Sequence, residues 1–206
     1  VGGMAMDRMC ASGLVSIATA AKGIMTGEMD IAVAGGLESI SLVQNKHKNS
    51  YRAQSKAVLA AMPTAYIQMI ETAEIVSRRY NISREAQDAY SLRSQQRVAA
   101  AQAAGLFADE IVPLTTSKLL FDKEGNETGR EEVTLLQDEG NRASTTLESL
   151  QALKPVWKNG QWVPQGEFMT AGNASQLSDG ASASVLMSLA QAERRGLAPL
   201  GTYRGL

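Results

Sequence analysis

Residues 31–36 read IAVAGG, a short apolar run that ends in two glycines. Such a run is typical of a strand covered on both faces of its sheet. Upstream of it, apolar residues recur with the spacing of one helix face, and Gly27 suits the end of that helix. The apolar positions are Leu14, Ile17, Ala18, Ala21, Ile24 and Met25. We therefore expect a helix followed by a buried strand.

The two ends of the chain carry similar small, apolar residues. The opening residues 1–6, VGGMAM, are predicted to form a further buried strand, which would give a strand–helix–strand unit with a right-handed crossover. Residues 183–189, ASVLMSL, are predicted as a strand, and 190–196 as a helix with Arg194 and Arg195 in its last turn. Both ends can share one sheet, so the fold class expected is α/β with the middle of the chain as an insertion.

The middle of the chain is polar and rich in helix and turn signals. One helix is predicted over about 64–80 and a second over about 84–104. Ser83 can cap the second helix, and Gly105 can end it. Residues 123–129, KEGNETG, are rich in turn formers and predict the tip of a hairpin.

Composition limits the classes of function. The chain has 206 residues, 44% hydrophobic and 20% charged, and a formal net charge of −1. These values are ordinary for a globular protein and give no reason to expect nucleic acid or an anionic membrane as a partner. A single cysteine excludes an intrachain disulfide, and no Cys/His cluster is available for a metal. We expect a cytoplasmic location, because a free thiol suits a reducing compartment.

The only cysteine, Cys10, lies in DRMCASG, residues 7–13, just before the first predicted helix. A thiol at a helix N-terminus faces free N–H groups and the positive end of the helix dipole, which favour the thiolate. The same N–H groups could stabilise an oxyanion after attack on a carbonyl. The alternative is a small buried residue at a strand–helix junction, since free cysteine is often buried. The residues alone leave both interpretations open.

DRMCASG and the AGGLES of residues 34–39 resemble the nucleophile segment of the thiolases, the acyl-CoA C-acyltransferases. TAGNAS, residues 170–175, is similar to a second thiolase segment. Residues 81–114 and 142–157 are similar to the thiolase loop domain. These matches occur in the family's order and extend over essentially the whole chain.

The resemblance implies a fold and a division of the chain. It implies a thiolase-type layered α-β-α fold, present as part of an N-terminal half, with an inserted α+β loop domain. Residues 1–40 would hold the nucleophile, 41–165 would form the loop domain over coenzyme A, and 166–206 would return to the core. Both ends of the sequence are abrupt, so we expect a central fragment of a longer protein. Alone, such a fragment is expected to expose apolar surface and to aggregate or depend on other chains.

The resemblance also implies site residues. Cys10 would carry the acyl group as a thioester. Residues matching the coenzyme A site are Arg142 and Ser149 near the nucleotide, Ala171 and Ser175 along the pantetheine arm, and Met69 and Trp157 as apolar lining. Each has a structural alternative: a surface charge, a helix-surface serine, tight packing of small residues, or ordinary core. Coenzyme A and acyl-CoA are expected as substrates, with no cofactor and no metal, in a homodimer or homotetramer.

The sequence departs from the family pattern in several places. Residues 68–70, QMI, stand where His-Met-Gly is common, and Gln176 and Ser178 stand where Gly and Asn are usual. The Gly-His-Pro, Asn-Glu-Ala-Phe and Cys-x-Gly-Gly motifs of the family's C-terminal half are absent. The one histidine, His47, lies among lysines and suits a solvated loop. We therefore expect this chain alone to be inactive.

Other functional classes remain as alternatives. A non-catalytic coenzyme A-binding, lipid-binding or structural subunit could keep a partial thiolase fold. A cysteine hydrolase would require a histidine close to Cys10, for which His47 is a poor candidate. Ketoacyl synthases usually carry Thr-Ala-Cys-Ser-Ser around their cysteine, which differs from DRMCASG. The excursion at 119–140 favours a degradative enzyme.

Overall fold

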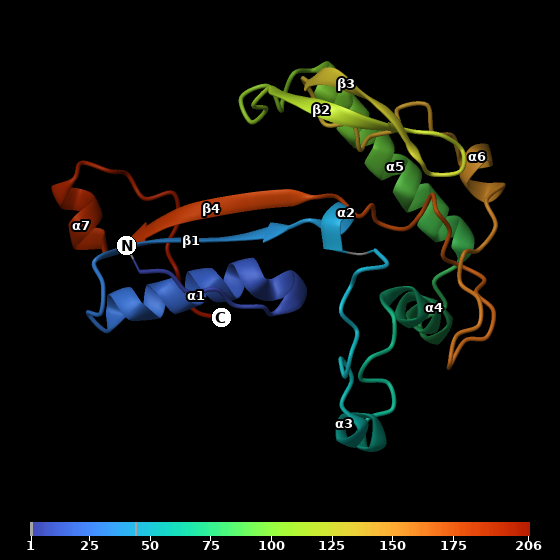
Figure 1. Cartoon of the computed structure of the whole chain (residues 1–206), viewed down its shortest axis with the longest axis horizontal. Coiled ribbons are helices and arrows are strands. Elements are labelled where there is room, and N and C mark those ends of the chain that lie inside the picture. Colours follow the sequence, from blue (N-terminus) through green and yellow to red (C-terminus); the bar gives the residue numbers. More distant parts are fainter. Residues whose placement is uncertain (1, 44) are drawn as a thin grey trace. The chain divides into compact units, whose positions relative to one another are not determined.

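The computed structural model describes residues 2–43 and 45–206 of the chain (Figure 1). These residues form two compact units. Unit 1 comprises the chain up to Ser50 together with Leu177–Leu206, and unit 2 comprises Tyr51–Gln176. Each unit is described below by itself.

Unit 1 is a two-stranded antiparallel sheet with helices. Strand β1 (Ile31–Glu38) pairs with β4 (Gly180–Met187), so that Ile31 lies opposite Met187 and Glu38 opposite Gly180. The remaining elements are the 3-10 turn η1 (Met9–Ala11) and the helices α1 (Ser12–Met25), α2 (Ile40–Val43) and α7 (Leu189–Arg194). The prediction that both ends of the chain share one sheet is confirmed.

Small residues let α1 approach β1 closely. A Cβ atom on Gly36 would lie 3.1 Å from the Cα atom of Gly13, in the first turn of α1. The Ser16 hydroxyl donates to the carbonyl of Gly35 at 2.7 Å. Gly27 terminates helix α1 as predicted: it follows the cap residue Thr26, its φ of +79° suits glycine, and the Glu28 N–H donates back to the carbonyl of Gly23.

Two predictions for unit 1 are wrong. Residues 2–6 form neither helix nor strand, so the first strand of the expected strand–helix–strand unit is absent from the part of the chain described. Strand β1 is covered by α1 on one face only: Ala34 is buried, whereas Val33 is 72% exposed. Side chains alternate along a strand, and a strand forms only where a partner supplies hydrogen bonds. Leu14 and Met25 are also exposed, at the two ends of α1.

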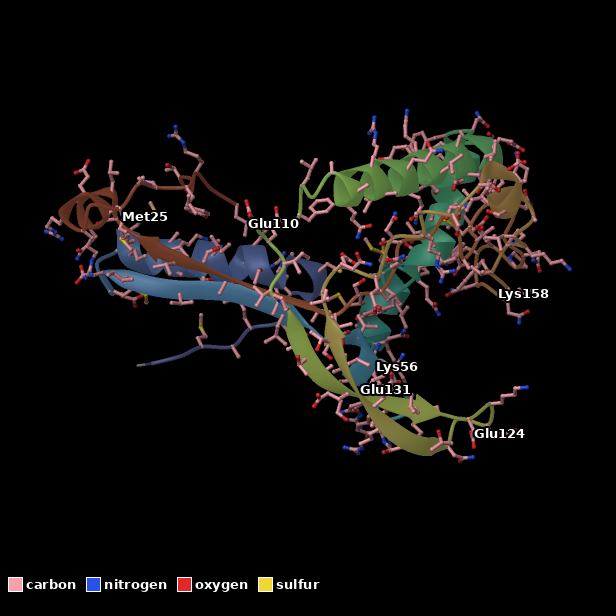
Figure 2. All side chains as sticks on the ribbon, turned by 90° about the horizontal axis from the view of Figure 1, so that it is seen from above. Met25, Lys56, Glu110, Glu124, Glu131 and Lys158 are labelled. Atoms are coloured by element: carbon pink, nitrogen blue, oxygen red, sulfur yellow. The ribbon has the colours of Figure 1, made fainter. Side chains whose placement is uncertain are left out.

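Unit 2 contains four helices and a hairpin in its described residues. The elements are α3 (Lys56–Ala61), α4 (Met69–Arg79), α5 (Arg84–Ala103), β2 (Leu114–Phe121), β3 (Glu127–Leu135) and α6 (Leu147–Gln151). The Ser83 hydroxyl caps α5 by accepting from the Ala86 N–H, as predicted. The predicted hairpin tip is confirmed, and Glu124 lies on it (Figure 2). Helix α4 begins at Met69 rather than near residue 64.

The interior of unit 2 is unusually polar. The side chains of Glu71, Glu74, Asp88 and Thr170 are buried. Among the described residues, the largest fully buried side chains are those of Glu74, Asp88 and Thr170. Buried charged groups destabilise a fold unless they are hydrogen-bonded. Among the described residues, every buried side-chain nitrogen and oxygen has a partner. This interior therefore depends on polar groups that are fully satisfied.

Within residues 2–43 and 45–206, none of the helices has the length and apolar character required to cross a bilayer.

Candidate active site

The segment that carries Cys10 is held by hydrogen bonds on both sides. The Asp7 carboxylate accepts from the Met9 N–H at 2.7 Å. The Ser12 hydroxyl accepts from the Arg8 N–H at 2.8 Å and donates to the Met9 carbonyl at 2.7 Å. Two short side chains thus fix the backbone around the cysteine before α1 begins.

Met9 adopts a left-handed conformation, with φ of +51°. This conformation costs a residue with a side chain roughly 1–2 kcal/mol. Such strained residues occur preferentially at functional sites. The turn leaves Cys10 exposed, two residues before the start of α1. A solvent-accessible thiol at the entrance to a helix can attack an electrophile, and the interpretation of Cys10 as a small buried residue is wrong for this structure.

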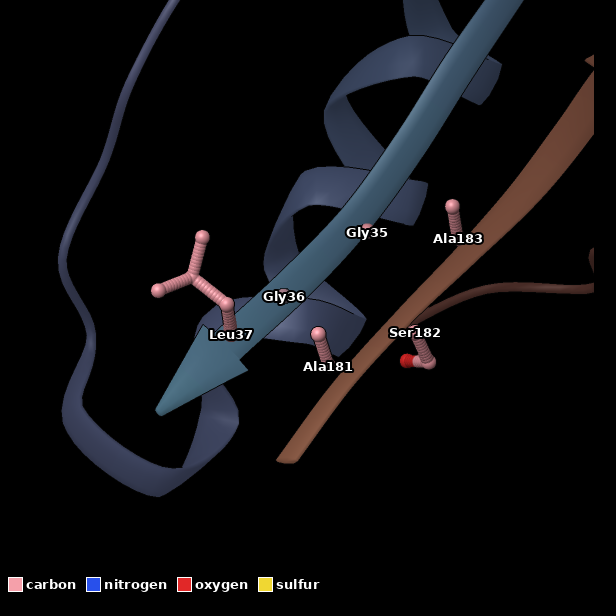
Figure 3. Close-up of a pocket in the computed structure, with 6 residues that line it drawn as sticks. All are labelled: Gly35, Gly36, Leu37, Ala181, Ser182 and Ala183. Atoms are coloured by element: carbon pink, nitrogen blue, oxygen red, sulfur yellow. The ribbon is translucent and has the colours of Figure 1, made fainter. Parts of the chain in front are cut away.

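The contact of Gly13 with Gly36 places the start of α1 against the C-terminal end of β1. A shallow hollow in this sheet is lined by Gly35, Gly36, Leu37, Ala181, Ser182 and Ala183 (Figure 3). Cys10 does not line this hollow. Apart from the Ser182 hydroxyl its lining is apolar, and none of its side chains is an acid or a base.

In unit 2, two buried carboxylates of α4 hold the loop at residues 157–169. Glu71 accepts from the backbone N–H of Val163 at 2.8 Å and from that of Trp162 at 2.5 Å. Val163 in turn accepts from the indole N–H of Trp157 at 2.9 Å. Trp157 is thereby fixed and half-buried near the first turn of α4, whereas Met69 in that turn is 80% exposed.

Glu74 extends the same arrangement. Its carboxylate accepts from the backbone N–H groups of Glu167, Phe168 and Met169 at 2.8–3.2 Å. Neither glutamate stands out in the sequence, because their spacing on α4 resembles an exposed polar face. Their partners lie about ninety residues further along the chain.

A second network holds the TAGNAS segment. The Asn173 amide donates to the Asp88 carboxylate at 3.0 Å and to the Phe168 carbonyl at 2.9 Å. Arg84 pairs with the other oxygen of Asp88 at 2.7 Å. A Cβ atom on Gly172 would lie 2.6 Å from side-chain atoms of both Leu150 and Leu153. Ala171 and Ser175, both exposed, therefore project from a segment fixed against α5 and α6.

Ser149 has a structural role in α6. Its hydroxyl accepts from the Thr146 N–H at 3.1 Å and donates to the Thr146 carbonyl at 2.8 Å, within a capping box. The donor of this hydroxyl is used, so Ser149 can offer a ligand only an acceptor lone pair. The pKa of the neighbouring Glu148 carboxyl is lowered by hydrogen bonds from the Glu148 backbone N–H and from the Thr146 hydroxyl.

Arg142 is exposed, and within the described part of the chain no carboxylate lies at ion-pair distance from it. Its backbone N–H donates to the side-chain oxygen of Gln95 at 2.8 Å. Its carbonyl accepts from the Thr145 hydroxyl at 2.7 Å. The guanidinium is thus free for an anion while its backbone is held on both sides.

The predicted site residues divide between the two units. Cys10 lies in unit 1, and Met69, Arg142, Ser149, Trp157, Ala171 and Ser175 lie in unit 2. Within unit 2, α4 with its loop holds Met69 and Trp157, and α5 with α6 holds the other four. His47 lies exposed in a loop of unit 1, where its backbone N–H donates to the side-chain oxygen of Asn45. This position suits the solvated loop predicted for it.

Comparison with known proteins identifies the family. The model of the thiolase N-terminal domain matches residues 1–190. The peroxisomal 3-ketoacyl-CoA thiolase A of Rattus norvegicus is 43% identical over 200 residues, which cover 97% of this chain and 43% of that protein. The beta-ketoadipyl-CoA thiolase of Pseudomonas putida is 40% identical over 218 residues, covering 99% of this chain and 50% of that protein.

A crystal structure of human mitochondrial 3-ketoacyl-CoA thiolase superposes with a TM-score of 0.68 at 33% identity, covering 95% of this chain and 48% of that one. This likeness shows a thiolase-type α/β fold. The chain spans about half the length of the relatives it matches. With an exposed cysteine held at the start of α1 and a family match over nearly its whole length, the chain belongs to the thiolase family.

Proposed function

We propose that this chain is the nucleophile-bearing part of an acyl-CoA C-acyltransferase that cleaves 3-ketoacyl-CoA with coenzyme A or runs the reverse condensation. The observation that carries the proposal is the exposed Cys10, held by Asp7 and Ser12 in a strained turn at the entrance to α1. The names of its relatives, 3-ketoacyl-CoA thiolase and beta-ketoadipyl-CoA thiolase, support this substrate class.

In the cleavage direction, the Cys10 thiolate attacks the 3-keto carbon and forms a carbon–sulfur bond. The bond between the second and third carbons then breaks, and its electron pair leaves with acetyl-CoA as a carbanion that takes up a proton. A second coenzyme A attacks the thioester and releases Cys10 as a thiolate. The chemistry needs a base and a proton donor. The chain offers one histidine, exposed in a loop, and no second cysteine.

We propose that other parts of the full protein supply these groups, and that this chain alone does not turn over. The residues for coenzyme A are those that unit 2 holds: Arg142 and Ser149 for the nucleotide, Ala171 and Ser175 for the pantetheine arm, and Met69 and Trp157 as apolar walls. Coenzyme A acts as substrate and no cofactor is required. The full protein would work in the cytoplasm as a homo-oligomer, which would also cover apolar side chains such as Val33 and Leu37.

The test is acyl transfer to Cys10. The full-length protein is incubated with acetoacetyl-CoA, and its intact mass and peptide map are recorded beside a Cys10→Ser variant. One acetyl group on Cys10, removed by coenzyme A and absent from the variant, is the expected result. Labelling elsewhere, or none in the full-length protein, would rule out the nucleophile.

Turnover is measured separately by following the loss of acetoacetyl-CoA in the presence of coenzyme A. No turnover is expected from the 206-residue chain. Sustained thiolysis by this chain would contradict the proposal that it depends on other parts of the protein. Binding of coenzyme A without acyl transfer, in the full-length protein, would instead favour a non-catalytic binding subunit.

A further inference from the structure

We infer that two glutamine side chains, Gln95 and Gln176, position Arg142 for the anionic nucleotide end of coenzyme A. The inference rests on the proposed function, because it deepens the role proposed there for Arg142. It adds two residues that do not touch the reacting atoms and that act through the segment at residues 138–142. We call this stretch the arginine segment.

Gln95 holds the arginine segment from α5. Its side-chain oxygen accepts from the Asn141 amide at 2.8 Å and from the Arg142 N–H at 2.8 Å. The Asn141 amide also donates to the Gln95 carbonyl at 2.9 Å. Gln95 is half-buried in a regular helix, so its oxygen has a fixed position. The backbone that carries Arg142 is thereby tied to a rigid element.

Gln176 holds the same segment from the other side. Its amide donates to the Gly140 carbonyl. A Cβ atom on Gly140 would lie 2.7 Å from the Gln176 oxygen, so glycine at this position allows the close approach. Gln176 directly follows Ser175, a residue proposed for the pantetheine arm. One side chain therefore links the segments proposed for the two ends of coenzyme A.

One bond within the arginine segment and one from α5 stiffen it further. The Asp138 carboxylate accepts from the Gly140 N–H at 2.7 Å, and Gln102 donates to the Asp138 carbonyl at 3.0 Å. The Arg142 guanidinium itself is exposed and, among the described residues, has no carboxylate at ion-pair distance. A long side chain loses less freedom on binding when its backbone is already fixed. Fixing the backbone therefore raises affinity without adding a contact to the ligand.

This arrangement predicts which ligands should bind more weakly when Gln95 is replaced. An arginine binds phosphate through charge-assisted hydrogen bonds. Loss of Gln95 should weaken binding of coenzyme A, which carries the phosphorylated nucleotide, and leave pantetheine, which lacks it, unaffected. A general loss of packing in unit 2 would weaken both ligands equally.

The experiment measures dissociation constants of coenzyme A and pantetheine by calorimetry on the full-length protein. Gln95→Leu removes the acceptor at similar volume, and Gln95→Glu keeps an acceptor oxygen. Gln96→Leu is the matched control, because Gln96 is the exposed neighbour on the same helix. We expect Gln95→Leu to weaken binding of coenzyme A about five- to tenfold and Gln96→Leu to leave it near the wild-type value. Gln95→Glu should lose less than Gln95→Leu, because it keeps the acceptor but adds a negative charge beside Arg142.

A double-mutant cycle separates positioning from independent effects. If Gln95 acts through Arg142, Gln95→Leu combined with Arg142→Ala should bind coenzyme A no more weakly than Arg142→Ala alone. Fully additive losses, or equal losses for pantetheine, would overturn the inference. Gln176→Gly, a change at an exposed residue, should weaken the binding of coenzyme A about two- to threefold. It serves as the second variant if Gln95→Leu does not fold.

Different results would overturn the proposed function and the inference about the two glutamines. If the wild-type protein does not bind coenzyme A, the proposed function fails, and the inference fails with it. If the wild type binds and Arg142→Ala weakens binding while neither glutamine variant does, only the inference is overturned. Weakening in Gln95→Leu with rescue in Gln95→Glu supports both.

Discussion

Each of the two units is stabilised internally by a different kind of contact. In unit 1, small residues bring backbones together, as where Gly13 meets Gly36 and where Gly35 lies against the backbone of β4. In unit 2, buried carboxylates gather backbone N–H groups from distant segments, as Glu74 does. The first kind tolerates no added atoms, and the second tolerates no lost acceptor. The difference predicts opposite sensitivities to substitution, which can be measured.

The largest effect is expected from Glu74→Leu. The change leaves three backbone N–H groups of the loop at residues 157–169 without an acceptor. We expect unit 2 to lose about 3–5 kcal/mol of unfolding free energy. Both tryptophans of the chain, Trp157 and Trp162, lie in this loop, so their fluorescence during urea unfolding reports the loss. Glu110→Leu, at an exposed position, should leave the midpoint unchanged.

Gly35→Ala tests the tight packing of unit 1. The added Cβ would clash with the backbone carbonyl of Ser182 in the paired strand. We expect a loss of about 2–3 kcal/mol in the protection of β1 amides from hydrogen exchange. Gly180→Ala is the control in the same sheet, because nothing lies within 4 Å of its Cβ position. Equal effects of the two changes would contradict the packing argument.

Ser12→Ala tests the turn that presents Cys10. The variant loses the acceptor for the Arg8 N–H and the donor to the Met9 carbonyl. Each such bond contributes about 1 kcal/mol, so the Arg8 amide should exchange about fivefold faster. Acetyl transfer to Cys10 should slow, while the fluorescence midpoint of unit 2 stays fixed. Ser94→Ala on the exposed side of α5 serves as the control, and faster Arg8 exchange there would indicate a non-local effect.

The smallest effect concerns the hairpin tip and is a dependence on pH. The Asn126 N–H and side-chain amide lower the pKa of the Asp122 carboxyl below its ordinary value. A lowered pKa in the folded state stabilises the hairpin above the ordinary carboxyl pKa of about 4, and this stabilisation is lost as the pH falls below that value through the lowered pKa. In Asp122→Asn the loss should be absent. Amide exchange of the Asn126 N–H, followed from pH 6 to pH 3, checks this, and identical profiles would contradict it.

Local signals in the sequence predicted the elements that depend on local bonds. Ser83 and Gly105 bound α5, Gly27 ends α1, and the turn formers at 123–129 form the hairpin tip. Residues 1–6 carried an equally apolar signal, yet residues 2–6 form no strand. A strand requires a partner, and composition does not report whether the partner is present.

The candidate site was predictable to a similar degree. The position of Cys10 before a helix left a reactive thiol and a small buried residue as open interpretations, and the family resemblance pointed to the reactive thiol. The groups that hold the site, such as Glu74 and Gln95, carry no signal in the sequence because each accepts from backbone N–H groups far away in the chain. No periodicity marks a side chain whose partner is a distant N–H. Such residues become visible only once the fold brings the segments together.

The pairing of β1 with β4 has a consequence for how the protein is made. Unit 2 is a continuous stretch, Tyr51–Gln176, and can fold as soon as it leaves the ribosome. Strand β1 is synthesised earlier but must wait for β4, which follows the whole of unit 2. During that interval the hydrogen-bonding edge of β1 that β4 will occupy is open to other chains. Chaperone binding during synthesis should therefore centre on the segment around IAVAGG, from which the fold is built.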